Sequence, residues 1–190
     1  KNKNEQVLNL LNVKYILQTD RSGATQVMQN PNALGNAWFV KQLSVLENAD
    51  KLMQSLDTLS PKTQAVTLDK SLKDTRYPVD SLALIKLKTY EPDRLVYTSE
   101  NKAEGLAVFS EIYYPHGWTA VLDDTTPLPI HQVDYILRGV VIPAGKHTLT
   151  FTFAPKIVQK GGYISLASTI AFVLIALGIV LISKKPRTNE

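Results

Sequence analysis

The 190-residue sequence contains no cysteine. Disulfide bonds, thiolate metal sites and a cysteine nucleophile are therefore excluded, but the compartment stays open because many exported bacterial domains also lack disulfides. The sequence also lacks the G-x-S-x-G elbow of serine hydrolases and the glycine-rich patterns that hold phosphates. It has no dense Lys/Arg stripe with interleaved aromatic residues, so the net charge of +4 gives no support for nucleic-acid binding.

No apolar segment and no initiator methionine stand near Lys1. The one long apolar run is at the other end, where residues 163–182 read YISLASTIAFVLIALGIVLI without a charge. About 20 such residues cross the hydrocarbon core of a bilayer, and apolar residues on every side favour a spanning helix over a buried helix of a soluble protein. Because nothing near Lys1 is suited to export the rest of the chain, we expect transmembrane helices upstream of this sequence.

The charges beside the apolar run predict its orientation. Lys184, Lys185 and Arg187 lie in the tail of residues 183–190, and short basic flanks stay in the cytoplasm. Lys156 and Lys160 on the other flank weaken this bias. We expect a cytoplasmic tail, with the preceding domain outside the membrane.

Residues 1–80 mix helical and strand patterns and are expected to form a small α/β part. Asn48 is a suitable N-cap, and the apolar residues after it recur at helical spacing. The expected elements are a helix at 5–12, strands at 13–17 and 37–40, a helix at 49–59 and a strand at 65–68.

Residues 81–155 carry short alternating segments between turn-forming residues. In the last segment His147, Leu149, Phe151 and Phe153 face one side and threonines face the other, which is typical of an antiparallel strand with one buried face. The pattern predicts a mainly β (α+β) fold with an antiparallel, jelly-roll-like β-sandwich, although a barrel fits the same evidence. A linker is expected at 156–162, and the expected strands are 81–90, 94–99, 105–114, 118–122, 139–142 and 146–153.

The histidines and carboxylates of the sequence do not form a recognisable catalytic or metal-binding pattern. His116, His131 and His147 fall on different predicted turns and strands, without metal-ligand spacing. The adjacent acids Asp123 and Asp124 are typical turn formers, and Glu111 is one carboxylate on a predicted strand. The sequence predicts no catalytic residue, metal site or cofactor.

Aromatic residues gather around the turn at residues 115–117. Exposed rings of Tyr113, Tyr114 and Trp118 would stack on sugar rings, whereas buried rings would pack in a sandwich core. Arg138 is suited to hold an acidic partner across the sheet, or a ligand carboxylate or phosphate. These four residues are the predicted carbohydrate or partner contacts.

Several segments together resemble a known family. They are LLNVKYIL from Leu10, NPNALGNAWFV from Asn30, and the long run from Ser110 that contains YYPHGW, LRGVV and PAGKH. They resemble the C-terminal part of YfhO-type bacterial membrane proteins, and the resemblance covers nearly the whole chain. That family commonly has a glycine where this chain has Asp124.

YfhO-type proteins in turn resemble C-type glycosyltransferases, which transfer a sugar from a lipid-phosphate donor on the outer face of the membrane to a cell-envelope acceptor. The resemblance implies an extracytoplasmic domain and last helix in a bacterial cytoplasmic membrane. The lipid bilayer and upstream helices of the same protein would be its partners, with envelope glycan or lipid-linked sugar as ligand. The catalytic carboxylate of such enzymes lies in an early outer loop, so none is carried over here. The rival interpretations are a membrane-anchored module that binds envelope carbohydrate or a protein, and a structural cap.

Overall fold

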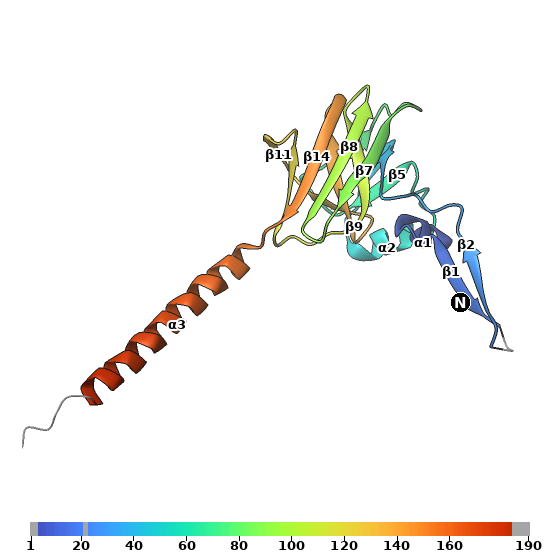
Figure 1. Ribbon diagram of the computed structural model, residues 1–190. Coiled ribbons are helices and arrows are strands. Elements are labelled where there is room, and N and C mark those ends of the chain that lie inside the picture. Colours follow the sequence, from blue (N-terminus) through green and yellow to red (C-terminus); the bar gives the residue numbers. More distant parts are fainter. Residues whose placement is uncertain (1–3, 21–22, 184–190) are drawn as a thin grey trace, which may run out of the picture. The chain divides into compact units, whose positions relative to one another are not determined.

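The computed structural model describes residues 4–20 and 23–183. The chain is mainly β, with antiparallel sheets, a small N-terminal part and one C-terminal apolar helix, as predicted (Figure 1). It divides into two compact units, one ending at Phe153 and the other beginning at Ala154. The basic tail with Lys184, Lys185 and Arg187 lies outside the described residues.

The first elements are a capped helix and a hairpin. Helix α1 (Glu5–Leu10) begins after Asn4, whose side chain accepts hydrogen bonds from the backbone amides of Gln6 and Val7. Strands β1 (Tyr15–Thr19) and β2 (Thr25–Gln29) then pair as an antiparallel hairpin. The first strand was predicted, whereas β2 was missed because its TQVMQ sequence has little apolar alternation.

A three-stranded sheet and helix α2 (Ala49–Ser55) complete the N-terminal part. The Asn48 side chain accepts from the Lys51 amide, which confirms the predicted N-cap. The helix ends earlier than predicted, and residues 56–58 form a turn. The sheet has the order β5-β4-β6 and contains β4 (Gln42–Val45), β5 (Gln64–Thr67) and β6 (Thr75–Arg76).

Two antiparallel sheets form the sandwich. One has the order β11-β10-β14-β8-β7 and the other the order β12-β13-β9-β3. Strand β3 comes from the N-terminal part, so residues before 80 supply an edge strand to the sandwich. The strands are β3 (Ala37–Val40), β7 (Leu84–Tyr90), β8 (Arg94–Asn101), β9 (Gly105–Ile112), β10 (Trp118–Leu122), β11 (Thr126–Leu128), β12 (His131–Val133), β13 (Leu137–Ile142) and β14 (Gly145–Phe153).

The core has two layers, one on each face of the four-stranded sheet. Between the sandwich sheets, the rings of Tyr97, Phe109 and Phe151 meet edge to face with centroids 4.9–5.9 Å apart. On the other face, Trp38, Val108 and Leu137 pack with Leu52 of α2. Each fully buried large apolar side chain contributes about 1.5–3 kcal/mol, so both layers hold this sheet in place.

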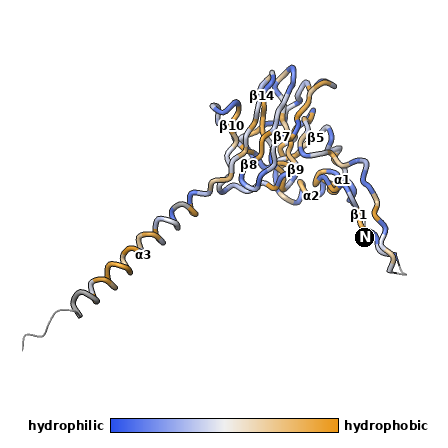
Figure 2. Tube along the Cα trace, in the orientation of Figure 1, coloured by the Kyte–Doolittle hydropathy of each residue, from blue (hydrophilic) through white to orange (hydrophobic). Residues whose placement is uncertain are grey.

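Helix α3 (Lys156–Ser183) has 28 residues and is long and apolar enough to cross a membrane (Figure 2). At 1.5 Å per residue it is about 42 Å long, close to the full thickness of a bilayer with its headgroups. Residues 156–162, expected as a linker, are helical instead, because a helix continues through Gly161 and Gly162 at about 1 kcal/mol each.

Candidate functional site

A surface pocket of about 280 Å³ lies beside the turn between β12 and β13. Helix α2 and the segments after β5 and β9 supply the rest of its wall. Two tyrosines, one amide, one carboxylate and two leucines line it, namely Tyr113, Tyr135, Gln132, Asp69, Leu52 and Leu68. This mixture of rings, apolar surface and a few polar groups is typical of a small-molecule site.

The turn that carries Tyr135 has unusual backbone geometry. Asp134 and Tyr135 have φ values of 47° and 74°, in the left-handed region that bulky residues rarely adopt. Such strain persists only where surrounding contacts hold it. Here the Tyr113 amide donates to the Ile136 carbonyl at 2.6 Å, and the Gln132 side-chain amide donates to the Tyr135 carbonyl. The turn is therefore fixed, and the Tyr135 ring stays at the pocket with 42% of its surface exposed.

Asp134 anchors this turn to the three-stranded sheet. Its Oδ1 accepts from the Val66 amide at 2.9 Å, and its own amide donates to the Val66 carbonyl at 2.8 Å. Its Oδ2 is buried without a hydrogen-bond partner among the described residues. Burial raises the pKa of Asp134 to about 7, although the hydrogen bond from Val66 opposes the shift. The carboxyl group is thus a structural element, which changes charge near neutral pH.

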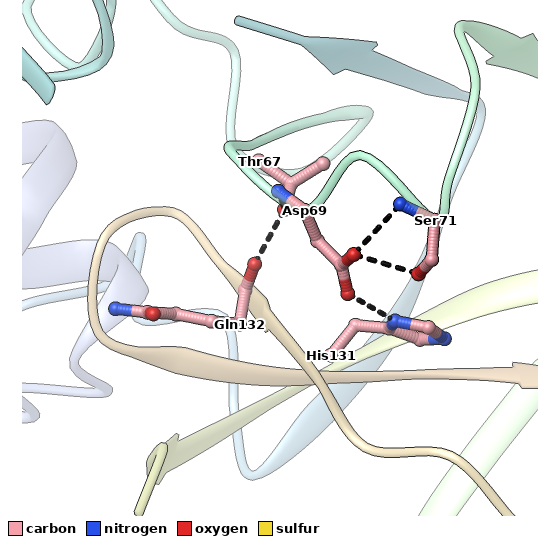
Figure 3. A network of polar contacts seen from close by, with 5 residues as sticks. All are labelled: Thr67, Asp69, Ser71, His131 and Gln132. Atoms are coloured by element: carbon pink, nitrogen blue, oxygen red, sulfur yellow. Dashed lines mark hydrogen bonds and ion pairs between the residues drawn. The ribbon is translucent and has the colours of Figure 1, made fainter. Parts of the chain in front are cut away.

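Asp69 is held at the pocket by a polar network (Figure 3). One carboxylate oxygen accepts from the Ser71 amide at 2.9 Å and the Ser71 hydroxyl at 2.6 Å, and the other lies 2.7 Å from His131 Nδ1. The Thr67 hydroxyl donates to the Gln132 carbonyl at 2.6 Å and ties β5 to β12. The hydrogen bond from His131 is the main cause that lowers the pKa of Asp69 to about 2.

This arrangement favours binding over catalysis. Asp69 stays ionised across the physiological pH range, whereas a general acid or base exchanges a proton near the working pH. Among the described residues, no group of three or more His, Asp or Glu side chains is placed to hold a metal ion. The site offers rings to stack on and fixed polar groups for hydrogen bonding.

The structure separates Tyr113 from the other three predicted contact residues, since Tyr114 and Trp118 share the Phe153 ring and Arg138 packs on Trp118. Tyr113 lines the pocket. Tyr114, half exposed, contacts the rings of His116 and Phe153 at centroid distances of 5.6 and 6.3 Å. Trp118 packs on the same Phe153 ring at 5.1 Å. Tyr114 and Trp118 therefore form an aromatic edge at the end of β14, separate from the pocket lining.

Arg138 is buried inside the sandwich, with 3% of its surface exposed. Leu137 and Arg138 are adjacent in β13 and face opposite sides of the four-stranded sheet, so Leu137 enters one core layer and Arg138 the other. The Arg138 guanidinium lies 4.1 Å from the Trp118 ring centroid, and its Nε donates to the Ile112 carbonyl at 3.0 Å. The buried charge is stabilised by an aromatic face and a carbonyl.

Glu111 shares this interior with Arg138. Burial raises the pKa of the Glu111 carboxyl, and the Arg138 charge opposes that shift. Arg138 Nη1 is buried without a hydrogen-bond partner among the described residues. Since Arg138 faces the core, its location gives no direct support for contact with a ligand in solution.

A second His–Asp pair joins the turns at the other end of the sandwich. His147 Nδ1 lies 2.7 Å from Asp123 Oδ2, and its Nε2 lies 3.1 Å from the Ala144 carbonyl. Both ring nitrogens are engaged by acceptors, and the hydrogen bond with Asp123 raises the pKa of His147. Asp123 and Asp124 have φ values of 48° and 60° in the loop between β10 and β11, which confirms them as turn residues. This pair is a structural clamp, because no ring nitrogen is free to act as a base.

Among the polar and aromatic residues of the pocket, three were not predicted from the sequence: Asp69, Gln132 and Tyr135. Asp69 and His131 are 62 positions apart, so their pairing depends on the tertiary fold. The available signal was Asp134 itself, with Val133 before it and Ile136 and Leu137 after Tyr135, because aspartate tolerates a left-handed turn between two short strands.

Comparisons of the chain with protein-family models, curated proteins and solved structures gave no match.

Proposed function

We propose that this chain is a membrane-anchored β-sandwich domain that binds a saccharide in the pocket between Tyr113 and Tyr135. The observation that carries the proposal is the pocket lining, which combines two tyrosine rings with the Asp69 carboxylate and the Gln132 amide. Sugar rings present weakly positive C–H groups, which favour the negative face of an aromatic ring. Their hydroxyl groups donate to and accept from carboxylates and amides.

The polar groups are prepared for this task before a ligand arrives. Asp69 is already oriented by Ser71 and His131. Gln132 is held by its bond to Tyr135, and its side-chain oxygen has no partner among the described residues. Binding therefore requires little further ordering of side chains, which favours affinity. A volume of about 280 Å³ is near the lower end of the range for small-molecule sites and suits one sugar unit.

We further propose that the domain lies outside a bacterial cytoplasmic membrane, as the non-catalytic C-terminal part of a YfhO-like glycosyltransferase. Helix α3 supplies a segment of suitable length for the anchor. The basic residues after it, Lys184, Lys185 and Arg187, favour a cytoplasmic C-terminus. In this arrangement the pocket holds envelope glycan or the sugar of a lipid-linked donor, while catalysis takes place elsewhere in the full protein.

The test is saccharide binding by the full chain in detergent micelles. Monosaccharides and short envelope-type glycans would be screened, and the best ligand titrated by calorimetry against the unchanged chain and Tyr135→Ala. Loss of one stacking ring is expected to weaken binding about 2- to 10-fold, since aromatic contacts are worth about 0.5–1.5 kcal/mol beyond the area they bury.

Tyr90→Ala is the matched control, because Tyr90 is an exposed tyrosine that does not line the pocket. It should bind as tightly as the unchanged chain. Binding that survives Tyr135→Ala and Gln132→Ala together, or no binding to any glycan, would contradict the proposed saccharide site.

A further inference from the structure

Exposed tyrosines gather at one end of the sandwich, which we name the tether end because β14 finishes there at Phe153. Among the described residues of the sandwich sheets and their turns, the exposed tyrosines are Tyr90, Tyr114 and Tyr135, with 64%, 50% and 42% of their surfaces accessible.

Strand register places these residues together. Trp118 pairs with Phe153, so β10 begins at the tether end. Tyr90 pairs with Leu95, beside the Arg94–Thr152 pair of β8 and β14. Tyr114 contacts the Phe153 ring directly, which places the end of β9 there. Leu137 pairs with Ile112 at that end of β9, so the turn with Tyr135 belongs to it as well.

The opposite end of the sandwich is different in character. It holds the turns after β8 and before β14, where Lys102 pairs with Asp80 and Lys146 pairs with Glu100. Strand β14 has nine residues, so the two ends are about 27 Å apart at 3.4 Å per step. The rings therefore mark one end only.

The chain itself limits how far the tether end lies from the apolar span. Phe153 is followed by Ala154 and Pro155, and α3 begins at Lys156. Three chain steps reach about 10 Å at most, and the helical residues 156–162 add about 10 Å before the apolar run. The headgroup layer on each side of a bilayer is about 5–8 Å thick. Phe153, at the end of β14, is thus attached within about 20 Å of the start of the apolar run.

We propose that Tyr90, Tyr114 and Trp118 at the tether end contact the headgroup layer of the bilayer that α3 crosses. This inference rests on the proposed membrane anchor but not on saccharide binding. Tyrosine and tryptophan favour this layer because the ring is apolar while the hydroxyl or N–H group reaches water. Glu91 and Asp93 lie beside Arg94 in the same region, so the contact is aromatic and does not require anionic lipid.

Tryptophan fluorescence of the full chain in phosphatidylcholine vesicles tests the contact. The chain has two tryptophans, Trp38 and Trp118. Trp38 is 9% exposed and donates to the Pro61 carbonyl in the core. Lipid with a nitroxide on its headgroup should quench the unchanged chain and leave Trp118→Phe, whose only tryptophan is Trp38, unquenched. The quenching should be the same when anionic lipid is added.

A second probe does not depend on Trp118. Because the chain lacks cysteine, Tyr114→Cys takes a single environment-sensitive dye, and Lys102→Cys at the opposite end is the matched control. The dye at position 114 should brighten on insertion into vesicles, while the dye at 102 should not. The proposal requires both the quenching and the brightening.

Flotation of vesicles distinguishes failure of the proposed membrane anchor from failure of the proposed headgroup contact. A chain that does not float with the vesicles would overturn the anchor and this inference together. A chain that floats, but shows no quenching at Trp118 or equal dye signals at 114 and 102, would overturn the headgroup contact alone and leave the anchor standing.

Discussion

Replacing Asp134 by asparagine should change how stability depends on pH. The variant keeps the side-chain oxygen that accepts from the Val66 amide, and asparagine tolerates the left-handed φ of 47° at this position. It removes the charge, which burial disfavours in the folded chain. Asp134→Asn therefore isolates the effect of protonation from the effect of backbone strain.

The two pKa values of Asp134 determine whether stability rises or falls with pH. Its ordinary value is 3.8 and its folded value is about 7, so the folded state holds one more proton between these limits. Stability supplied by this group is full below pH 3.8 and is lost as pH rises through 7. Each pKa unit corresponds to about 1.4 kcal/mol, so the loss is on the order of 4 kcal/mol at most.

Urea unfolding of the full chain in detergent, followed by tryptophan fluorescence from pH 4 to 8, measures this loss. The unchanged chain should lose stability with rising pH relative to Asp134→Asn, and the difference between the two curves should level off above pH 7. Asp69 titrates near pH 2 and does not enter this range. Parallel curves for the two chains would refute the assignment of a buried, protonated Asp134.

Three further predictions concern the fold. Phe109→Ala should lower the free energy of unfolding by about 3–5 kcal/mol, because the fully buried ring contacts Tyr97 and Phe151; urea titration measures it. Asn48→Ala should cost about 1 kcal/mol in the same assay, since it removes the N-cap of α2. The raised pKa of His147 means that the His147–Asp123 pair adds stability below pH 6.5, which is lost as pH rises through the folded value. Asp123→Asn should abolish that step in a pH series of unfolding curves.

The sandwich was predictable where local patterns are strong. Alternation from Lys146 to Phe153 follows directly from one buried and one exposed face, and the observed strand differs by a single residue. The predicted strands 37–40 and 118–122 match β3 and β10, because a short apolar run between turn residues is typical of a buried strand. The uncharged run at residues 163–182 also predicted the helix that the structure shows as part of α3.

Short strands and the site itself were harder to predict. Strands β6, β11 and β12 have only two or three residues, too few to show a period, and their partners decide their conformation. Arg138 faces inward because the sheet that carries it has a core layer on each face, which alternation along one strand does not reveal. The pocket joins residues from four separate segments, and a single sequence does not show which of them become neighbours.

The location of the pocket gives its proposed function a geometric reason. Tyr135 belongs to the tether end, and the Tyr113 amide binds the same turn. If that end contacts headgroups, a saccharide bound between Tyr113 and Tyr135 is held close to the membrane surface and away from the charged turns around Lys102 and Lys146. Because β14 separates the two ends by about 27 Å, a ligand site at the far end would lie beyond the headgroup layer. If the proposed anchor and the proposed saccharide site both hold, ligands displayed at the membrane are favoured over soluble ones.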